Sequence, residues 1–300
     1  MKMLESIRKK LGMWNYAAAP KGDRSTVDEP WHSRRISAPA RWLCGVTDIG
    51  RRRRTNQDNY HLSGNGRLWI VADGMGGHAA GEVASALTIE AIVASLAAQD
   101  AEPGDAAHAG ARLARAFAAA QDLVSSRGHG DADCLGMGST AMAAIVDGEA
   151  LHLCHVGDVR AYHWSRGELR HVTNDHSLVW EMVLSGVLTP AEARTHPHRG
   201  TVTQAIGASK SIVPEISRLM LRHKDRVLLC SDGLWEALAD HDLRRIVGSR
   251  GSMRDLALTL VDRANAAGGE DNITAVLYEH TVPRTFWSPF RGNLRGVLRK

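Results

Sequence analysis

The sequence has no apolar run of the ~18 residues that a membrane-spanning helix needs, so we expect no transmembrane segment. Its first sixteen residues carry lysine and arginine but lack the apolar stretch of a signal peptide, which favours a cytoplasmic protein. The cysteines are few and far apart, at Cys44, Cys134, Cys154 and Cys230. This scatter excludes a zinc ribbon and suits a reducing compartment. The sequence contains no internal repeat, no P-loop and no zinc-protease motif.

The composition that is present belongs to a folded protein. Of the 300 residues, 44% are hydrophobic and 23% are charged, which excludes a disordered chain and allows one large domain or two small ones. The net charge of +4 is unevenly spread. Residues 1–41 hold nine basic and four acidic residues, and residues 281–300 hold five basic residues and no acidic one. The part between them is acidic, so the charge indicates solubilising tails rather than a nucleic-acid-binding surface.

Prolines and polar residues set the first forty residues apart from the rest. We therefore expect a basic, flexible N-terminal extension over 1–40, a folded domain over 41–280 and a basic C-terminal tail over 281–300. Within the extension, Leu4, Ile7, Leu11 and Trp14 have helical spacing. That pattern fits either a helix that docks on an anionic surface or a partner, or a short frayed helix.

Short apolar runs and turn residues alternate through the folded part. The strands come in clusters and the helices in pairs, which favours antiparallel sheets with helices outside over a strict alternation of strand and helix. Strands are predicted over 42–47, 67–72, 140–146, 151–156, 160–164, 212–219, 226–230 and 272–278, helices over 78–98, 107–126, 176–186, 240–247 and 252–264, and a polar loop up to residue 200.

Aspartates stand at the ends of several of these strands. Asp73, Asp158 and Asp232 each follow an apolar run, and Asp271 opens the last strand. An aspartate before glycine is often only a turn former, and for Asp158 alone the two interpretations are equally good. For Asp73 we favour a function, because the closely spaced glycines after it lead into a helix and let the backbone approach a ligand.

Converging carboxylates would raise one another's pKa and lose their ionisation unless cations lay between them. Oxygen ligands favour hard ions such as Mg²⁺ or Mn²⁺ and disfavour zinc. Such ions attract phosphate and lower the pKa of bound water. Four successive arginines at 51–54 add what an anion site needs, since a guanidinium matches phosphate oxygens in a bidentate manner, although most of the four are surface charge.

Six motifs, in this order and at this spacing, resemble those of the bacterial branch of the metal-dependent protein phosphatases of type 2C. The resemblance covers roughly residues 42–280. The motifs are Asp48–Asp58, Ala72–Glu82, Gly136–Thr140, Gly157–Tyr162, Ser231–Gly233 and Asp271–Thr274.

The resemblance implies a four-layer α-β-β-α sandwich of two antiparallel sheets flanked by helices, with residues 41–280 as the catalytic domain. It also implies hydrolysis of phosphoserine and phosphothreonine in proteins by a hydroxide that bridges two Mn²⁺ or Mg²⁺ ions, with a third, weaker ion. The substrates would be phosphoproteins made by a cognate bacterial Ser/Thr kinase. We expect a cytoplasmic monomer without a nucleic-acid partner.

The same resemblance assigns the metal ligands. Asp73 would bridge the two ions, and the carbonyl of Gly74 would bind one of them. Asp232 and Asp271 would complete the other ion's ligands, and Asp158 with Asp232 would hold the third ion.

It further assigns three residues around the metals. Arg53 would bind the phosphate, Asp58 would hydrogen-bond to the metal waters, and His78 would protonate the leaving oxygen. For His78, a histidine that merely begins a helix is a serious alternative.

The chain also departs from the family pattern. Gln57 stands where glutamate is usual, Gln204 where arginine is common, and Val159 where serine is usual. None of these changes removes a metal ligand. Residues 176–207 correspond to a mobile flap near the site, which we expect to determine specificity.

Three other interpretations fit the sequence less well. Cys154 and Arg160 have the spacing of cysteine-dependent phosphatases, but the segment between them alternates like a strand and Asp158 would repel phosphate. A calcium loop from Asp131 fails, because Leu135 occupies a ligand position. A phosphatase fold that binds without catalysing is disfavoured, because the four predicted acidic ligands are all present.

Overall fold

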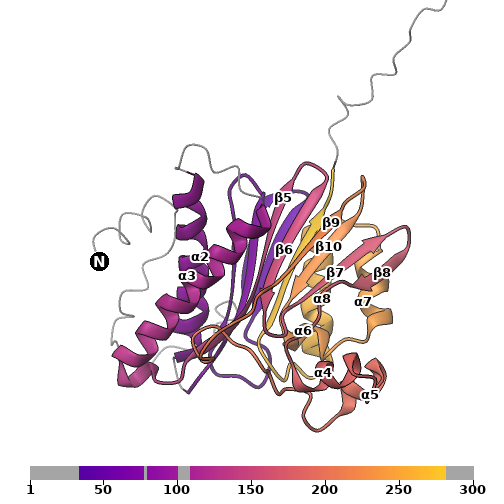
Figure 1. Cartoon of the computed structure of the whole chain (residues 1–300). Coiled ribbons are helices and arrows are strands. Elements are labelled where there is room, and N and C mark those ends of the chain that lie inside the picture. Colours follow the sequence, from indigo (N-terminus) through magenta and orange to yellow (C-terminus); the bar gives the residue numbers. More distant parts are fainter. Residues whose placement is uncertain (1–33, 78–79, 101–108, 282–300) are drawn as a thin grey trace, which may run out of the picture.

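The computed structural model describes residues 34–77, 80–100 and 109–281. In these residues two antiparallel sheets pack face to face, and helices cover both outer faces (Figure 1). The predicted α-β-β-α sandwich is therefore confirmed.

One sheet has six strands and carries both the first and the last strand of the described chain. All of its neighbouring strands are antiparallel. In spatial order the strands are β1 (Arg34–Ala40), β2 (Leu43–Asp48), β11 (Ile273–Glu279), β10 (Arg226–Cys230), β7 (Arg160–Ser165) and β8 (Glu168–His171).

The other sheet has five strands, again all antiparallel. In spatial order they are β3 (Asp58–Leu62), β4 (Leu68–Met75), β5 (Gly138–Asp147), β6 (Ala150–Val156) and β9 (Glu215–Met220).

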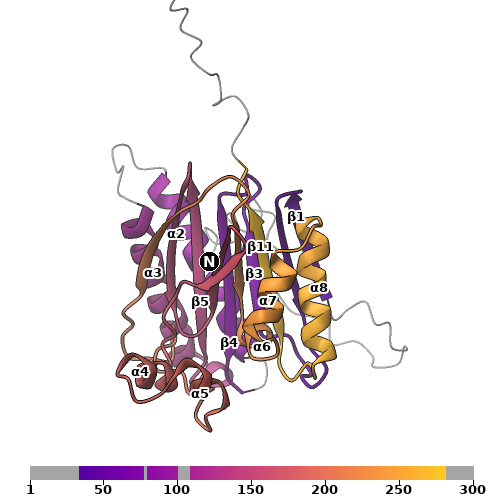
Figure 2. The same cartoon turned by 90° about the vertical axis from the view of Figure 1, so that its right-hand side faces the viewer.

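The helices fall into three groups, two of which cover the sheets. In Figure 1, α2 and α3 lie on the left beside the five-stranded sheet, and α7 and α8 lie on the right. Both views show α4 and α5 at the lower end of the molecule (Figures 1 and 2). The helices are α2 (Ala80–Asp100), α3 (Ala109–Gly130), the short 3₁₀ turn η1 (Ala132–Cys134), α4 (Leu178–Leu184), α5 (Pro190–Thr195), α6 (Asp232–Trp235), α7 (Asp240–Val247) and α8 (Met253–Ala266).

The inner strands are apolar on both faces because each face is buried. In β4, Trp69 and Val71 belong to the core between the sheets, whereas Ile70 packs in the core under α2 and α3. In β10, Leu229 faces the inter-sheet core and Leu228 the core under α7 and α8. Full burial of such a side chain contributes about 1.5–3 kcal/mol, so the continuous apolar runs follow from the four layers.

Helix α2 is long and apolar enough, by length and composition alone, to cross a membrane, which the expectation from the sequence did not foresee. Of its most apolar stretch, 61% is buried inside the protein, and its buried residues join the core over the five-stranded sheet. This burial is typical of a helix that packs in the core of a folded domain.

The structure differs from the predicted elements in several places, among them the short helix α6 and the turn η1, which were not predicted. The stretch assigned to a flexible extension, 1–40, ends in strand β1, which pairs with β2, so residues 34–40 belong to the folded part. Strands β3 and β8 were not predicted, because each is short and polar. Part of the predicted polar loop before residue 200 is helix α5, which Thr189 and Glu192 begin with a capping box. The predicted helix of the extension lies outside the described residues.

Candidate active site

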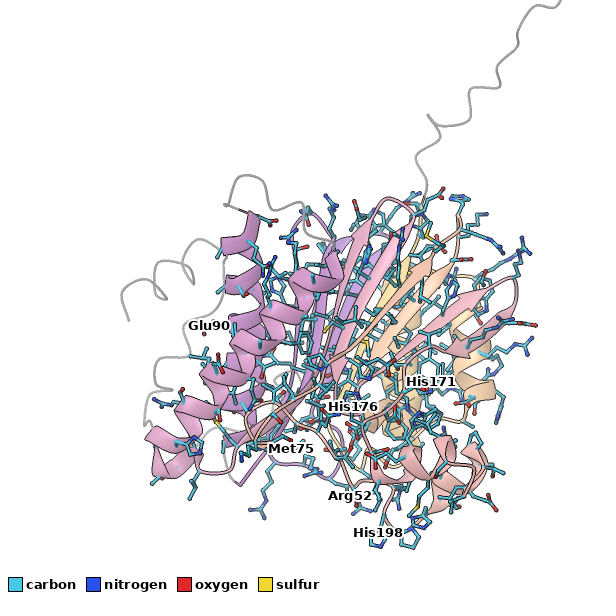
Figure 3. The ribbon with its side chains drawn as sticks, viewed as in Figure 1. Arg52, Met75, Glu90, His171, His176 and His198 are labelled. Atoms are coloured by element: carbon cyan, nitrogen blue, oxygen red, sulfur yellow. The ribbon has the colours of Figure 1, made fainter. Side chains whose placement is uncertain are left out.

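The predicted acidic residues meet at one end of the sandwich. Asp58 opens β3 directly opposite Asp73 of β4, and Asp232 follows β10 as the first residue of α6. Asp271 precedes β11, and Asp158 lies in the turn between β6 and β7. The neighbouring strand ends are aligned as well, since Cys230 is opposite both Ala275 and Arg160. Figure 3 shows Met75, the last residue of β4, and Arg52 toward the lower end, where α4 and α5 also lie.

The carboxylates are close enough to perturb one another strongly. Burial, followed by the negative charges of Asp58 and Asp232, raises the pKa of Asp73 well above its ordinary value. Burial, followed by Asp158 and Asp271, does the same for the pKa of Asp232. The pKa of Asp158 rises to about 7, first through burial and then through the charge of Asp175. The site is thus a concentration of negative charge that needs compensation.

Asp58 is held by hydroxyl groups from the other sheet. Its Oδ2 atom accepts hydrogen bonds from Ser231 Oγ at 2.6 Å and from Thr274 Oγ1 at 2.7 Å. Burial raises the pKa of Asp58 to about 6, although both hydroxyls favour the ionised form. Ser231 and Thr274 stand inside two of the six sequence motifs, yet their role as donors was not foreseen.

Gly74 lies where the end of β4 contacts the start of α2. A Cβ atom at Gly74 would be 1.9 Å from the carbonyl oxygen of Gly81 and 2.9 Å from that of Gln57. Both distances are too short for any residue with a Cβ atom, so only glycine fits here. A Cβ atom at Gly81 would in turn be 2.8 Å from the Gly74 oxygen. The two glycines therefore allow the end of β4 and the start of α2 to approach closely.

Arg53 reaches the acidic cluster from the loop between β2 and β3. Its Nη2 atom donates a hydrogen bond to Asp271 Oδ2 at 2.6 Å, and 51% of its side chain is exposed. Asn272 fastens this loop: its side-chain nitrogen donates to the carbonyls of Ile49 and Thr55, and its side-chain oxygen accepts from the backbone N–H of Gln57 at 2.8 Å. The residue beside Asp271 thus fixes the loop that carries the arginine, which the sequence did not reveal.

A second charged group, which is buried, supports Asp158. Arg160 makes a bidentate ion pair with Asp175, in which Nε donates to Oδ1 and Nη2 to Oδ2, and its guanidinium carbon lies 3.5 Å from the centre of the Trp235 ring. The Trp235 indole nitrogen donates to the backbone oxygen of Asp158 at 3.0 Å. The involvement of Asp175 and Trp235 was missed, because neither residue falls in one of the motifs.

The remaining predicted residues are placed as follows. His78 lies outside the described residues. Gln204 belongs to the flap and accepts a hydrogen bond from the backbone of Val213 at 2.7 Å. The flap is anchored at its base by an antiparallel bridge between Ser177 and Val202. Val159 is fully buried in the core between the sheets, which suits an apolar residue at that position.

The structure opposes the alternative chemistries. Cys154 lies within strand β6 and is fully buried, and burial raises the pKa of its thiol to about 12, so it is not a thiolate at neutral pH. Asp131 caps the 3₁₀ turn and pairs with Arg127 at 2.9 Å. Those local contacts account for Asp131 without a calcium ion.

The oxygen atoms of the cluster suit a hard cation. Buried Oδ1 atoms of Asp58 and Asp232 receive no hydrogen bond from the described residues. Unpaired buried carboxylate oxygens are costly, and divalent cations with oxygen ligands would satisfy them. The predicted donor set contains neither cysteine nor histidine, so it fits Mg²⁺ or Mn²⁺ better than zinc.

Known proteins share both this sequence and this fold. Residues 49–277 match the family model described as Protein phosphatase 2C. The protein phosphatase PhpP of Streptococcus pneumoniae is 37% identical over 236 residues, which is 77% of this chain and 94% of that protein. The serine/threonine phosphatase PstP/Ppp of Mycobacterium tuberculosis has a crystal structure that matches 83% of this chain and 99% of its own, with 33% identity and a TM-score of 0.72. The PstP catalytic domain in complex with two manganese ions matches the same shares, with 32% identity and a TM-score of 0.70. The chain belongs to the protein phosphatase 2C family, as its six motifs predicted.

Proposed function

We propose that this protein is a metal-dependent phosphatase that hydrolyses phosphoserine and phosphothreonine in proteins. The observation that carries the proposal is the meeting of Asp58, Asp73, Asp158, Asp232 and Asp271 from both sheets, beside an arginine on a fastened loop. The names of the relatives, which are serine/threonine phosphatases, support this substrate class.

Mn²⁺ or Mg²⁺ ions would be held by the acidic cluster. Asp73 and the carbonyl of Gly74 would bind the first ion, and Asp73, Asp232 and Asp271 the second. Asp158 with Asp232 would hold a third, weaker ion. When bound, the ions would supply positive charge for the phosphate and lower the pKa of a water molecule. The two manganese ions of the PstP complex support this cofactor.

Arg53 would bind the phosphate oxygens. Its guanidinium carries five N–H donors in a planar fork, so one can remain on Asp271 while others face the substrate. Because Asn272 fixes both ends of the loop, the arginine needs little ordering when phosphate arrives. In the transition state its charge would stabilise the equatorial oxygens.

Protons would be managed by Asp58 and His78. Asp58 keeps Oδ2 on the two hydroxyls and has Oδ1 left to accept a hydrogen bond from water in the site. We assign to His78 the protonation of the leaving serine or threonine oxygen, since it follows the glycines of the Asp73 motif in the sequence.

The test is phosphate release by the purified full-length protein from phosphoserine and phosphothreonine peptides in the presence of Mn²⁺. We expect turnover in the parent, loss of turnover in Asp73→Asn, and parent-like turnover in Asp147→Asn, an exposed aspartate on a hairpin. A folded parent that binds Mn²⁺ but releases no phosphate would instead favour a protein that binds phosphoproteins without hydrolysing them.

The cellular role follows from the chemistry of the substrate. Phosphoserine and phosphothreonine are made by Ser/Thr kinases, so we propose that the protein reverses the action of such a kinase. The cysteines at 44, 134, 154 and 230 are free and buried, which supports a reducing compartment such as the cytoplasm. We further propose that the catalytic domain acts as a monomer and that the basic segments before β1 and after residue 281 take no part in catalysis.

A further inference from the structure

Three side chains of types that can bind metal ions gather at the root of the flap, outside the acidic cluster. His155, His176 and Glu215 each present a ligand atom, and these atoms all lie within 4.8 Å of one another. The two imidazole rings are stacked, with centroids 4.9 Å apart and planes inclined by 23°. Figure 3 shows His176 between the strands and the lower end where α4 and α5 lie.

The backbone fixes all three positions. His155 of β6 stands in register with Glu215, the first residue of β9. His176 is tied on both sides, because its backbone N–H donates to Gly157 at 2.9 Å and its carbonyl accepts from Thr203 at 2.8 Å. The cluster therefore joins two strands of the sheet to the first residue of the flap.

One residue, Asn174, orients two of the three side chains. Its backbone oxygen lies 2.9 Å from Nε2 of His155, so the neutral ring donates there and keeps its lone pair on Nδ1. Its side-chain nitrogen donates to Glu215 Oε2 at 3.1 Å. Outer hydrogen bonds of this kind, to the far side of a histidine and to a ligating carboxylate, are typical of protein metal sites.

His176 is also ready to bind. Its Nδ1 atom accepts only a long hydrogen bond, 3.2 Å, from the backbone of Gly157. Burial lowers the pKa of His176 to about 4 and also lowers that of His155, so both rings are neutral at physiological pH. Coordination through Nδ1 would exchange this weak hydrogen bond for a bond to metal without removing a proton.

We propose that His155, His176 and Glu215 form a further metal site, for Zn²⁺ or a similar borderline ion such as Co²⁺. Two imidazoles and one carboxylate are a zinc-type donor set that leaves a fourth position open. The donor set is unlike the all-oxygen set of the acidic cluster, so the two sites prefer different ions. An ion here would clamp the root of the flap to the sheet. His155 stands three residues before Asp158 in the sequence, so this clamp would lie close to the proposed active site along the chain.

The experiment counts bound zinc. Metal-free full-length protein in excess Mg²⁺, which competes for the acidic cluster, is titrated with Zn²⁺ against a chromophoric chelator. We expect His176→Gln and Glu215→Gln each to bind one equivalent fewer than the parent. His198→Gln is the matched control, because His196 and His198 form a neighbouring histidine pair on the flap, and it should bind as many equivalents as the parent.

Binding of Co²⁺ gives a second, independent measurement. A visible absorption band of four-coordinate Co²⁺ should appear in the parent and in His198→Gln and be absent from His176→Gln and Glu215→Gln. Circular dichroism in Mg²⁺ alone establishes that each variant is folded. Equal zinc equivalents in the parent and both cluster variants, or loss of the equivalent in His198→Gln, would overturn the proposal. Neither measurement depends on phosphatase activity, so this proposal and the proposed function can fail separately.

Discussion

Arg53 donates a hydrogen bond to Asp271, with 2.6 Å between Nη2 and Oδ2. The pair links the proposed phosphate-binding side chain to a proposed metal ligand, and the next residue, Asn272, fastens the loop that carries the arginine. Asp271 and Asn272, directly before strand β11, thus position both the proposed metal ligand and the loop that carries the arginine. Charge alone at position 53 is therefore not enough, since the planar fork must serve Asp271 and phosphate together.

Replacement of Arg53 by lysine should lower kcat/KM for p-nitrophenyl phosphate by roughly 10- to 100-fold. Lysine keeps the charge but loses the fork, and a hydrogen bond to a charged group is worth about 1.5–3 kcal/mol. Steady-state kinetics in saturating Mn²⁺ measures the effect. Arg52→Lys is the control, because the Arg52 side chain is 69% exposed and its Nε atom lies 3.5 Å from Glu270 Oε1. Equal losses in both variants would refute a special role for Arg53.

Removal of a carboxylate from the cluster should abolish activity without destabilising the protein when it is free of metal. In Asp73→Asn and Asp232→Asn we expect kcat/KM to fall by more than ~100-fold, since even outer partners of metal ligands cost 10- to 100-fold. In chelator, however, loss of one of several repelling charges should keep the unfolding temperature equal to that of the parent or raise it. Calorimetry in chelator and in Mn²⁺ measures both states. A marked fall of the unfolding temperature in chelator would show that these aspartates are structural instead.

Burial and the charge of Asp175 make the stability that Asp158 contributes depend on pH. Its pKa is about 7 in the folded protein against an ordinary value of 3.8, so the folded state binds more protons than the unfolded state between these values. Stability from this group is therefore full below about pH 4 and is lost as the pH rises through 7. Buried neutral histidines such as His171, with a pKa of about 3, act in the opposite sense below pH 6.5.

The comparison with Asp158→Asn removes that background. In chelator, the unfolding temperature of the variant relative to the parent should increase as the pH rises from 5 to 8. A difference between the two proteins that stayed constant over this range would contradict the raised pKa of Asp158.

Much of the fold was predictable because strong apolar runs mark its inner strands. The runs around Val71 and Leu229 are buried on both faces and were identified from the sequence. Strand β1 was not, because it contains Pro39 and none of its residues is buried, so its sequence resembles a loop, and only pairing with β2 makes it a strand. Strand β3 was not predicted either, because its first two residues, Asp58 and Asn59, have low strand propensity.

The sequence predicted the proposed metal ligands but not the residues that surround and hold them. Asp73 and Asp232 stand in motifs with neighbouring glycines, which a sequence displays directly. The contacts of Asp58 with Ser231 and Thr274 join residues more than 170 positions apart, which no local pattern reveals. Asp175 is similar, because an isolated aspartate gives no sign that it will neutralise a buried arginine.

If catalysis depends on metal ions, chelation should abolish activity. Removal of Cys154, which has the spacing of cysteine-dependent phosphatases, should leave activity unchanged. Excess EDTA should abolish phosphate release, and Mn²⁺ should restore it. Cys154→Ser should be avoided, because it would bury a hydroxyl, whereas Cys154→Ala should keep kcat/KM within about twofold of the parent since the thiol is buried in β6. Activity that survived EDTA and disappeared in Cys154→Ala would require the cysteine mechanism.

The buried pair of Arg160 and Asp175 should be the costliest ion pair to break. Only 10% of the arginine and 2% of the aspartate side chain are exposed, so Asp175→Asn leaves a desolvated guanidinium without its counter-charge. We expect the free energy of unfolding to fall by about 3–5 kcal/mol. The exposed pair of Arg67 and Asp147 is the matched control, and Asp147→Asn should cost no more than ~1 kcal/mol. Urea unfolding of both variants measures the difference. Equal losses of stability in the two variants would mean that the stack on Trp235 alone holds Arg160 in place.

The same substitution should affect the proposed third ion. Because Arg160 stacks on Trp235, whose indole nitrogen donates to the backbone oxygen of Asp158, Asp175→Asn should weaken binding of that ion and raise the Mn²⁺ concentration needed for half-maximal activity.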